Sequence, residues 1–326
     1  MERGVGVSTP PGQDPPGHNG TAKRAPGVRR LSMAPHHRRR RAVALLSMVG
    51  IVAAGVAGVF VLLGGGDGVS HHARTGPRGR GRVLAGLRAL SPAAHEAAAE
   101  DGAIDRTLAY TPYVRIAGAQ HREIALTFDD GPGPYTPEIL STLERRHVPA
   151  TFFEVGVAER YFSASTARIV ADGDPIGDHT EVHAPMSELH ASQQRAQLLE
   201  QAAAIERHGA AFPRLFRPPY GLWNATTVGL LRRYRMLMVL WTVDTNDYER
   251  PGVPAIVKAA VGGARPGAII LLHDAGGDRS ETVAALPRII SELRGRGYKL
   301  VTVPRLLLDN PPPRVQDIAA VLGTGG

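Results

Sequence analysis

The chain has 326 residues, a formal net charge of +8 and no cysteine. The length is enough for one large domain or two small ones, and the missing cysteines exclude disulfides, thiolate zinc sites and cysteine nucleophiles. The charge does not indicate a nucleic-acid-binding groove, because residues 1–41 alone carry nine Lys or Arg and two Asp or Glu, whereas residues 116–308 hold 21 basic and 21 acidic groups.

Residues 1–41 are rich in Gly, Pro and Arg and show no apolar periodicity, so we expect a disordered basic tail. Residues 42–63 then run for 22 residues without a charge, which is long enough to cross a hydrocarbon core of about 30 Å. We predict a single transmembrane anchor, with the tail in the cytoplasm and everything after Leu63 outside. The main alternative is a signal peptide cleaved from a secreted protein, although signal cores usually span about 7–15 residues. A buried helix of a soluble domain is a further alternative.

Residues 64–115 have the composition of a flexible stalk. They begin with GGGDG and continue with GPRGRGR, and both stretches are typical of flexible linkers. Some helical character is expected around SPAAHEAAAE, where Ser91 would cap a helix that begins at Pro92. We expect no chemistry in this segment.

From residue 116 to residue 308 short apolar runs alternate with amphipathic stretches. The apolar runs include IALTF, ATFFEV, MLMVLWTV, GAIILL and KLVTV. Nearly continuous apolar strands that alternate with helices indicate a parallel sheet covered on its outside. At least six such units favour a barrel over an open sheet, with the functional residues at the C-terminal ends of the strands. Residues 309–326 are expected to be a peripheral tail.

Polar residues gather where these apolar runs end. If the runs form a barrel, the polar residues would meet at one rim. They are Asp129 and Asp130, His179 and His183, Arg217 and Tyr220, Asp244 and Asp247, and His273 and Asp274.

Two histidines in this set, His179 and His183, have the spacing of paired metal ligands. A separation of four residues places two imidazoles on one face of a helical turn. Such a pair also occurs by chance on solvated surfaces, so a carboxylate is needed beside it. Asp129 or Asp130 would supply that carboxylate and leave open positions for water, as in catalytic zinc sites.

The neighbouring Asp129 and Asp130 present a problem of geometry and of charge. Adjacent side chains in an extended strand point to opposite faces, so both can serve one site only if the chain turns between them. Gly131 and Pro132 would provide that turn. One carboxylate could then bind a metal ion while the other acts as a base, and the ion would relieve their repulsion. An Asx turn or a helix cap is the structural alternative.

The motifs TFDDGP, HTEVH, RPPYG, DTNDY and LLH occur in an order and with a spacing that resemble NodB-type polysaccharide deacetylases, carbohydrate esterase family 4. The stretch VPATFFEVG is similar to the second strand of that family. The resemblance covers about residues 121–307. It implies an α/β fold, a distorted (β/α) barrel of about seven strands, and metal-dependent hydrolysis of N-acetyl groups on a glycan.

The resemblance also implies a role for each motif residue. Asp129 would be the catalytic base, held ionised and oriented by Arg217, and Asp130, His179 and His183 would be the metal ligands. The backbone N–H of Tyr220 would donate to the oxyanion. His273 would be the general acid, with Asp244 as the carboxylate that keeps it protonated, and Leu271 and Tyr248 would wall the acetyl pocket.

Two positions depart from the family pattern. Tyr248 stands where relatives usually have Trp, which keeps an aromatic wall but adds a hydroxyl. Asp178 stands before His179 where relatives more often have Asn, and we expect it to place an extra negative charge beside the metal. Neither departure removes a ligand, the base or the acid.

The resulting hypothesis is an extracytoplasmic, membrane-anchored N-deacetylase of GlcNAc or MurNAc residues in peptidoglycan. Zinc is the default metal, with cobalt or nickel as alternatives. Chitin-type oligomers, an exported polysaccharide and acetylated xylan are alternative substrates. A barrel that binds glycan without catalysis is an alternative from another class, and no nucleic-acid partner is expected.

Overall fold

The computed structural model describes residues 91–317. The predicted tail, the predicted anchor, residues 64–90 of the predicted stalk and residues 318–326 lie outside this range. Within residues 91–317 no helix is both long and apolar enough to cross a membrane.

The centre of the described region is one sheet of nine strands, and every strand pairing between them is parallel. The strands are β1 (Tyr113–Val114), β2 (Glu123–Asp129), β3 (Thr151–Glu154), β4 (Ile176–Asp178), β5 (Leu215–Phe216), β6 (Leu237–Val239), β7 (Val243–Asp244), β8 (Ile269–His273) and β9 (Lys299–Val301). Their order is β1-β6-β5-β4-β3-β2-β8-β7, and β9 pairs with β2. All seven residues of β2 are buried, as expected for a strand with both faces covered.

The sheet curls because one short segment pairs at two distant places in the strand order. Strands β6 and β7 are separated by only three residues, yet β6 pairs with β5 and β7 pairs with β8. Residues 237–244 therefore join the two sides of the sheet. The sequence predicted one continuous strand here, and the structure divides it into two short ones.

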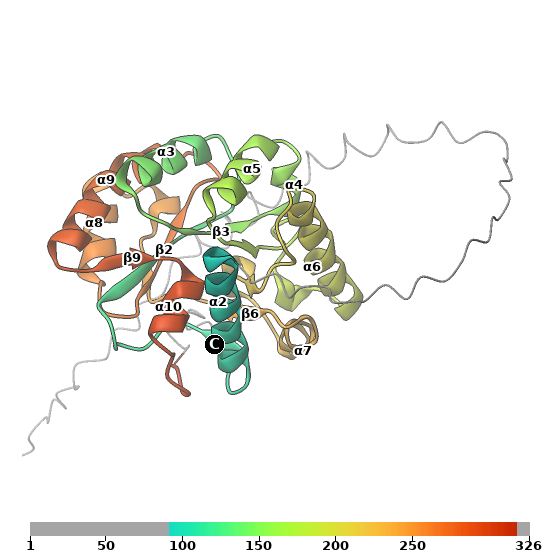
Figure 1. Cartoon of the computed structure of the whole chain (residues 1–326). Coiled ribbons are helices and arrows are strands. Elements are labelled where there is room, and N and C mark those ends of the chain that lie inside the picture. Colours follow the sequence, from blue (N-terminus) through green and yellow to red (C-terminus); the bar gives the residue numbers. More distant parts are fainter. Residues whose placement is uncertain (1–90, 318–326) are drawn as a thin grey trace, which may run out of the picture. The chain divides into compact units, whose positions relative to one another are not determined.

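The helices lie around the outside of the strands (Figure 1). They are α2 (Pro92–Leu108), α3 (Thr136–Arg146), α4 (Gly156–Glu159), α5 (Ser163–Asp172), α6 (Ala191–Glu206), α7 (Ala225–Tyr234), α8 (Val253–Gly262), α9 (Ser280–Gly295) and α10 (Val303–Asp309). Local sequence explains several ends. Asn224 caps α7 with a side-chain oxygen that accepts from Thr227 N, and α5 ends at Gly173 in the left-handed conformation.

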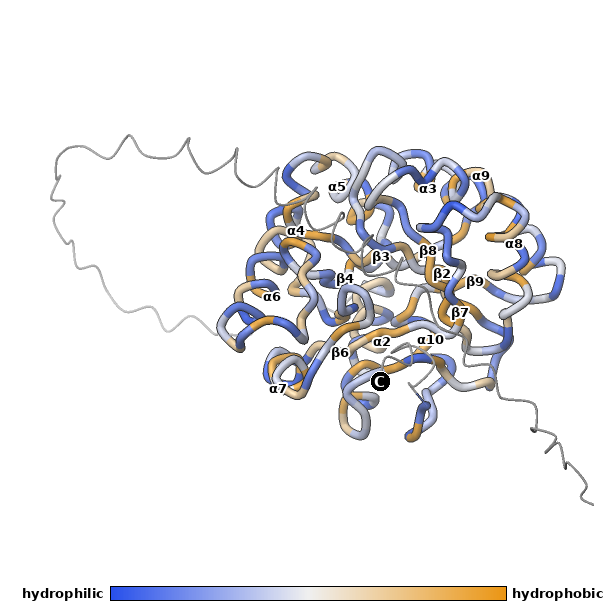
Figure 2. Tube along the Cα trace, turned by 180° about the vertical axis from the view of Figure 1, so that it is seen from behind, coloured by the Kyte–Doolittle hydropathy of each residue, from blue (hydrophilic) through white to orange (hydrophobic). Residues whose placement is uncertain are grey.

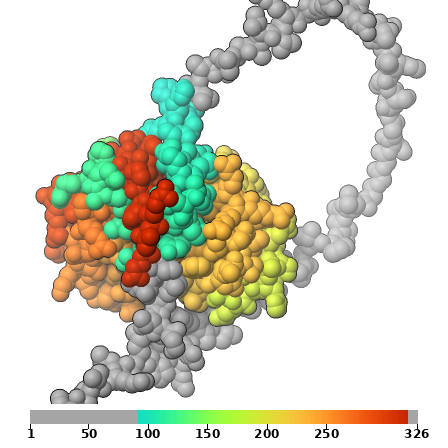
Figure 3. All heavy atoms as spheres, turned by 90° about the horizontal axis from the view of Figure 1, so that it is seen from below, coloured from blue at the N-terminus to red at the C-terminus, as the bar shows by residue number. Residues whose placement is uncertain are grey.

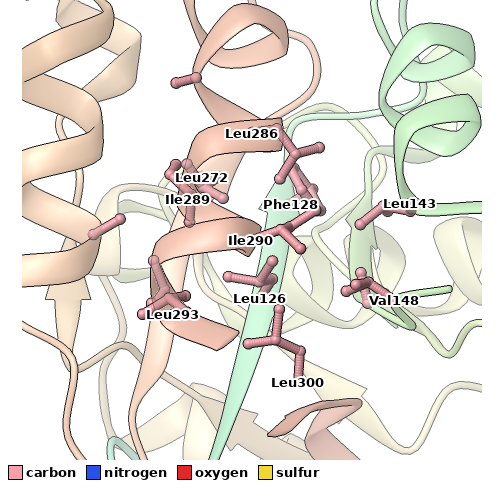
Figure 4. Packing of buried hydrophobic residues seen from close by; sticks show 14 of the residues in the cluster. Leu126, Phe128, Leu143, Val148, Leu272, Leu286, Ile289, Ile290, Leu293 and Leu300 are labelled. Atoms are coloured by element: carbon pink, nitrogen blue, oxygen red, sulfur yellow. The ribbon is translucent and has the colours of Figure 1, made fainter. Parts of the chain in front are cut away.

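The largest hydrophobic cluster lies between the sheet and helices α3, α8 and α9. Figure 4 shows Leu126 and Phe128 of β2 close to Leu286 and Ile290 of α9. Each fully buried side chain of this kind contributes about 1.5–3 kcal/mol. In Figure 2 the central strands are mostly hydrophobic, whereas much of the helical surface is hydrophilic. The core therefore fixes the strands whose ends carry the polar motifs.

The structure differs from the expected stalk over residues 92–115, which belong to the folded domain. Ser91 caps α2 as predicted, with its hydroxyl oxygen accepting from Ala94 N at 3.2 Å. Helix α2 packs against α10, and the two segments lie side by side in Figure 3. Ala103 and Ile104 of α2 are buried in a second cluster that also contains residues of β6 and α10. The alanine-rich sequence concealed this role, because alanines pack without a strong apolar stripe.

The C-terminal segment is also part of the domain as far as residue 317. Asn310 is fully buried; its side-chain oxygen accepts from His121 N at 2.6 Å, and its amide donates to Glu123 Oε2 at 2.9 Å. Gln316 Oε1 accepts from the backbone of Arg115 and Ile116. Residues 310–317 therefore satisfy backbone and carboxyl groups that precede β2, in contrast to the expected peripheral tail.

Candidate active site

The strand that carries the two aspartates ends as the sequence predicted. Asp129 is the last residue of β2, and Asp130 takes a left-handed backbone with φ of 72° before a cis Gly131–Pro132 bond. Both carboxylates consequently face the same side: His179 Nε2 is 3.8 Å from Asp129 Oδ2 and 3.5 Å from Asp130 Oδ1. Glycine at 131 suits the turn, because an added Cβ would overlap the buried carboxylate of Asp274.

Asp130, His179 and His183 form one compact group. Their ligand atoms all lie within 4.8 Å of one another, and His183 Nε2 is 3.0 Å from Asp130 Oδ1. His179 Nδ1 is 2.7 Å from the carbonyl oxygen of Arg217. A carbonyl only accepts, so Nδ1 is the donor of this hydrogen bond, and Nε2 is the nitrogen that faces Asp130. His183 Nδ1 lies 3.1 Å from the hydroxyl of Tyr220.

The two histidines lie on a loop after β4, not on the helical turn that their spacing suggested. Residues 179–183 contain no helix. Thr180 and His183 have φ of 71° and 54°, and Thr180 N donates to Asp178 Oδ1 at 2.7 Å. The loop still brings the imidazole centroids to 4.9 Å. Spacing alone could not distinguish this loop from a helix, because both place the rings together.

These residues fit a divalent metal ion. Asp130 Oδ1 is buried and makes no hydrogen bond within residues 91–317, and it faces the Nε2 atoms of both histidines. Burial alone would raise the pKa of Asp130, but His183 and His179 outweigh burial and hold that pKa well below its usual value. Two imidazoles and one ionised carboxylate are a common donor set for catalytic zinc.

Asp129 has a different environment. Arg217, fully buried, donates from one terminal nitrogen to Asp129 Oδ1 at 2.6 Å and to Thr127 Oγ1 at 2.8 Å. Its Nε donates to the carbonyl of Val239 at 3.0 Å, and its guanidinium lies 4.1 Å from the ring centre of Phe153. Burial lowers the pKa of Arg217 and Asp129 counteracts that effect, but a guanidinium stays charged in proteins. Arg217 thus orients Asp129 and compensates its charge.

His273 pairs with Asp247, which corrects the expected pairing with Asp244. His273 Nδ1 is 2.7 Å from Asp247 Oδ1, and the backbone N–H of His273 donates to Asp247 Oδ2 at 2.8 Å. Thr282 Oγ1 donates to the same carboxylate at 2.7 Å. Burial would lower the pKa of His273, but Asp247, Asp130 and Asp129 outweigh it and raise the pKa to about 9. His273 is therefore cationic at neutral pH.

Asp244 lies at the end of β7, and its carboxylate accepts from Asn246 N at 2.9 Å. Burial raises the pKa of Asp244 from its ordinary value. Asn246 then turns the chain with φ of 51°, and a 3₁₀ turn over Asp247–Glu249 places Asp247 against His273. The motif DTNDY offers two carboxylates three residues apart. The choice between them depends on this turn, which the sequence did not reveal.

The three remaining predicted site residues, Tyr220, Tyr248 and Leu271, lie close to His183 or His273. Tyr220 has φ of 60° in a 3₁₀ turn between Pro219 and Gly221. The ring of Tyr248 meets His273 edge-on at 5.3 Å between centroids, and 40% of Tyr248 is exposed. The hydroxyl of Tyr248 donates to Asn246 Oδ1 at 3.0 Å. Leu271 is buried two residues before His273 on β8, so both side chains point to the same face of that strand.

Two buried carboxyls beside the site were not given a role by the sequence. Asp274 accepts a hydrogen bond from Thr136 Oγ1, and burial raises its pKa to about 7. Asp178 is fully buried, and burial raises its pKa well above the usual value. Burial therefore acts against the extra negative charge that we expected Asp178 to place beside the metal ligands.

Several known proteins are similar to this chain over the domain described above. The sequence profile of the polysaccharide deacetylase family matches residues 117–239. A chitooligosaccharide deacetylase from Bradyrhizobium sp. (strain ANU 289) is 36% identical over 198 residues, which cover 57% of this chain and 90% of the relative. A peptidoglycan-N-acetylglucosamine deacetylase from Bacillus cereus is 38% identical over 187 residues, which cover 56% of this chain and 87% of the relative.

A solved structure is similar over the same region. It is a peptidoglycan N-acetylglucosamine deacetylase in complex with 4-naphthalen-1-yl-N-oxidanyl-benzamide, and it aligns with a TM-score of 0.59 at 31% sequence identity. The alignment covers 63% of this chain and 95% of that one. The sequence relatives and this structural relative therefore match over nearly their whole length.

Proposed function

The chain belongs to the polysaccharide deacetylase family and is a hydrolase of carbon–nitrogen bonds other than peptide bonds; from this premise we propose that it removes N-acetyl groups from GlcNAc or MurNAc residues of peptidoglycan. We further propose that the reaction depends on a divalent metal, by default zinc, held by Asp130, His179 and His183. The relatives described above are deacetylases of chitooligosaccharides and of peptidoglycan, so the choice of peptidoglycan as the substrate is part of the proposal.

One observation carries the proposal: the two neighbouring aspartates have separate partners. Asp130 faces His179 and His183, whereas Asp129 is bound by the buried guanidinium of Arg217. A carboxylate that shares the site without being the metal's own ligand is available to accept a proton. This division supports a base beside a metal centre, which hydrolysis of an unactivated amide requires.

The chemical steps divide between the two sides of the site. A bound divalent ion would supply Lewis acidity, which lowers the pKa of water from about 16 toward 7 and polarises the acetyl carbonyl. Asp129, oriented by Arg217, accepts the proton of the attacking water. Such general base assistance is typically worth about 10²–10⁴-fold in rate.

The leaving amine needs a proton, and His273 is arranged to give it. Its pKa of about 9 keeps it charged at neutral pH, and Asp247 fixes the ring through Nδ1. Nε2 is consequently the nitrogen that donates to the amine. The backbone N–H of Tyr220 is proposed to stabilise the oxyanion, and one such donor is typically worth about 3–4 kcal/mol.

The experiment is acetate release from purified peptidoglycan, chitin oligomers and acetylated xylan, with chelation and metal add-back. Asp129→Asn should lower the rate by about 10²–10⁴-fold while zinc stays bound, because Asn keeps the shape but accepts no proton. Asp130→Asn is the matched control and should lose zinc together with the rate. Full activity of Asp129→Asn would overturn the mechanism, and glycan binding without acetate release would favour a non-catalytic barrel.

We propose that the catalytic domain works outside the cytoplasm, anchored by residues 42–63. The support is the uncharged run of 22 residues directly after four arginines. The full chain should remain in the membrane fraction after extraction at alkaline pH, and protease added outside intact spheroplasts should digest the catalytic domain. Recovery of full-length protein in the soluble cell fraction would contradict the anchor, and an N-terminally shortened protein in the medium would indicate a cleaved signal.

A further inference from the structure

The two histidines of the proposed metal site are oriented by different kinds of group. His179 Nδ1 meets a backbone carbonyl, that of Arg217, at 2.7 Å. His183 Nδ1 meets a side-chain hydroxyl, that of Tyr220, at 3.1 Å. The rings of His183 and Tyr220 also contact each other edge-on, with 4.6 Å between their centroids. The contact therefore involves both the hydroxyl and the ring of Tyr220.

Metal binding through Nε2 places a requirement on the other ring nitrogen. Nε2 must present its lone pair, so Nδ1 must hold the proton and needs an acceptor. The hydroxyl oxygen of Tyr220 can be that acceptor. His183 Nε2 lies 3.0 Å from Asp130 Oδ1, on the side of the ring where a bound ion would lie, while the hydroxyl of Tyr220 contacts the opposite nitrogen.

We propose that the Tyr220 hydroxyl is a positioning group for His183 and strengthens metal binding, separately from the backbone N–H of the same residue. The proposal rests on the proposed metal site but not on the identity of the glycan. A hydrogen-bond partner of a metal-binding histidine typically contributes about 10–100-fold to metal affinity or activity. The residue would then act twice, through its hydroxyl on the metal ligand and through its backbone on the substrate.

Tyr220→Phe separates these two actions, because it removes the hydroxyl and keeps the ring and the backbone N–H. We expect the dissociation constant for zinc, measured on the full chain by competition with a chromophoric chelator, to rise about tenfold. Thermal unfolding of the metal-free protein should change little. A dissociation constant within twofold of wild type would overturn the proposal, whether or not the chain releases acetate.

Tyr248→Phe is the matched control, since it removes another phenol hydroxyl at the same site. That hydroxyl lies 3.0 Å from Asn246 Oδ1, so its loss should leave zinc affinity within twofold of wild type. An equal loss of affinity in both variants would contradict a specific role of Tyr220. If Tyr220→Phe does not fold, the histidine-ring ¹H–¹⁵N spectrum of the zinc-loaded wild type decides. A His183 Nδ1–H proton that exchanges slowly with water supports the proposal, and one that exchanges as fast as a solvent-exposed ring proton overturns it.

Discussion

Asp129 and Asp130 are chemically identical neighbours, and their surroundings give them different tasks. Asp129 faces a buried guanidinium at 2.6 Å, which orients its carboxylate. Asp130 faces two imidazoles. The left-handed turn at Asp130 is what allows both side chains to reach one pocket. The sequence predicted this division from the glycine and proline that follow, because no regular strand could have produced it.

The choice of partner for His273 leads to a testable prediction about pH. Asp247 is the main cause of the raised pKa of His273, and a protonated His273 is the acid form that the reaction uses. In Asp247→Asn the pKa of His273 should fall, because burial remains and only the weaker effects of Asp130 and Asp129 still oppose it. The alkaline limb of kcat/KM should therefore move to lower pH, with a loss of roughly tenfold or more at pH 8 relative to pH 5.5.

The control for this prediction is Asp244→Asn, the variant that the sequence would have favoured. Asp244 makes no hydrogen bond to His273 within the described residues; its carboxylate accepts from Asn246 N instead. Asp244→Asn should therefore shift the alkaline limb of kcat/KM much less than Asp247→Asn does. A larger shift in Asp244→Asn would restore the pairing that was expected from the sequence.

At the scale of elements, four acidic side chains are buried between β3, β4 and the helices α4 and α6. Each has a carboxyl oxygen without a hydrogen-bond partner within residues 91–317; they are Glu154, Glu159, Asp178 and Glu181. Burial is the largest cause of the raised pKa of every one of them. Burial therefore opposes the ionised form of each of these carboxyls, although Glu181 also forms an ion pair with Arg160.

This cluster predicts that the domain loses stability as the pH rises. Glu159 has a pKa of about 8 in the folded protein, against an ordinary value of 4.5. Its folded-state pKa is raised, so its contribution is complete below about pH 4.5 and is lost as the pH approaches 8. In Glu159→Gln the free energy of unfolding should fall less between pH 5 and pH 8 than in wild type.

Urea unfolding at several pH values measures this effect. Glu188→Gln provides the comparison, because Glu188 is an exposed residue of the same region and should leave the pH dependence unchanged. Equal pH dependence in wild type and Glu159→Gln would show that the cluster is solvated or compensated by Arg207 and Arg160, which both act to lower the pKa of Glu159.

The sequence predicted long buried strands better than short ones and turns. The runs IALTF and GAIILL lie in β2 and β8. Both strands could be predicted because a short continuous apolar run is a distinctive pattern of a buried strand. The two-residue strand β1 carried no such signal. The alanine-rich helix α2 was expected as a helix with Ser91 as its cap, but not as part of the folded domain. The histidine loop and the placement of Asp247 depend on left-handed residues at Thr180, His183 and Asn246, and these are seldom predictable for residues other than glycine.

At the scale of the whole described region, residues 91–317 form one parallel, curled sheet with its functional residues at the ends of the strands. The sequence predicted a parallel sheet with functional residues at the strand ends, but as a barrel of about seven strands, whereas the described sheet has nine strands and an order with two ends. It placed the beginning and the end of the domain wrongly, because α2 and residues 310–317 join the fold through packing and hydrogen bonds with distant segments. Contacts of that kind leave no local pattern in the sequence.

Arg217 links the chemistry to the segment that joins the two sides of the sheet. Its guanidinium donates to the carbonyls of Val239 and Leu240 in that segment, and also to Asp129. The base is therefore aligned only when residues 237–244 are in place. A chain in which this segment is displaced would lose the alignment of its base, so catalytic activity also reports on the correct folding of residues 237–244.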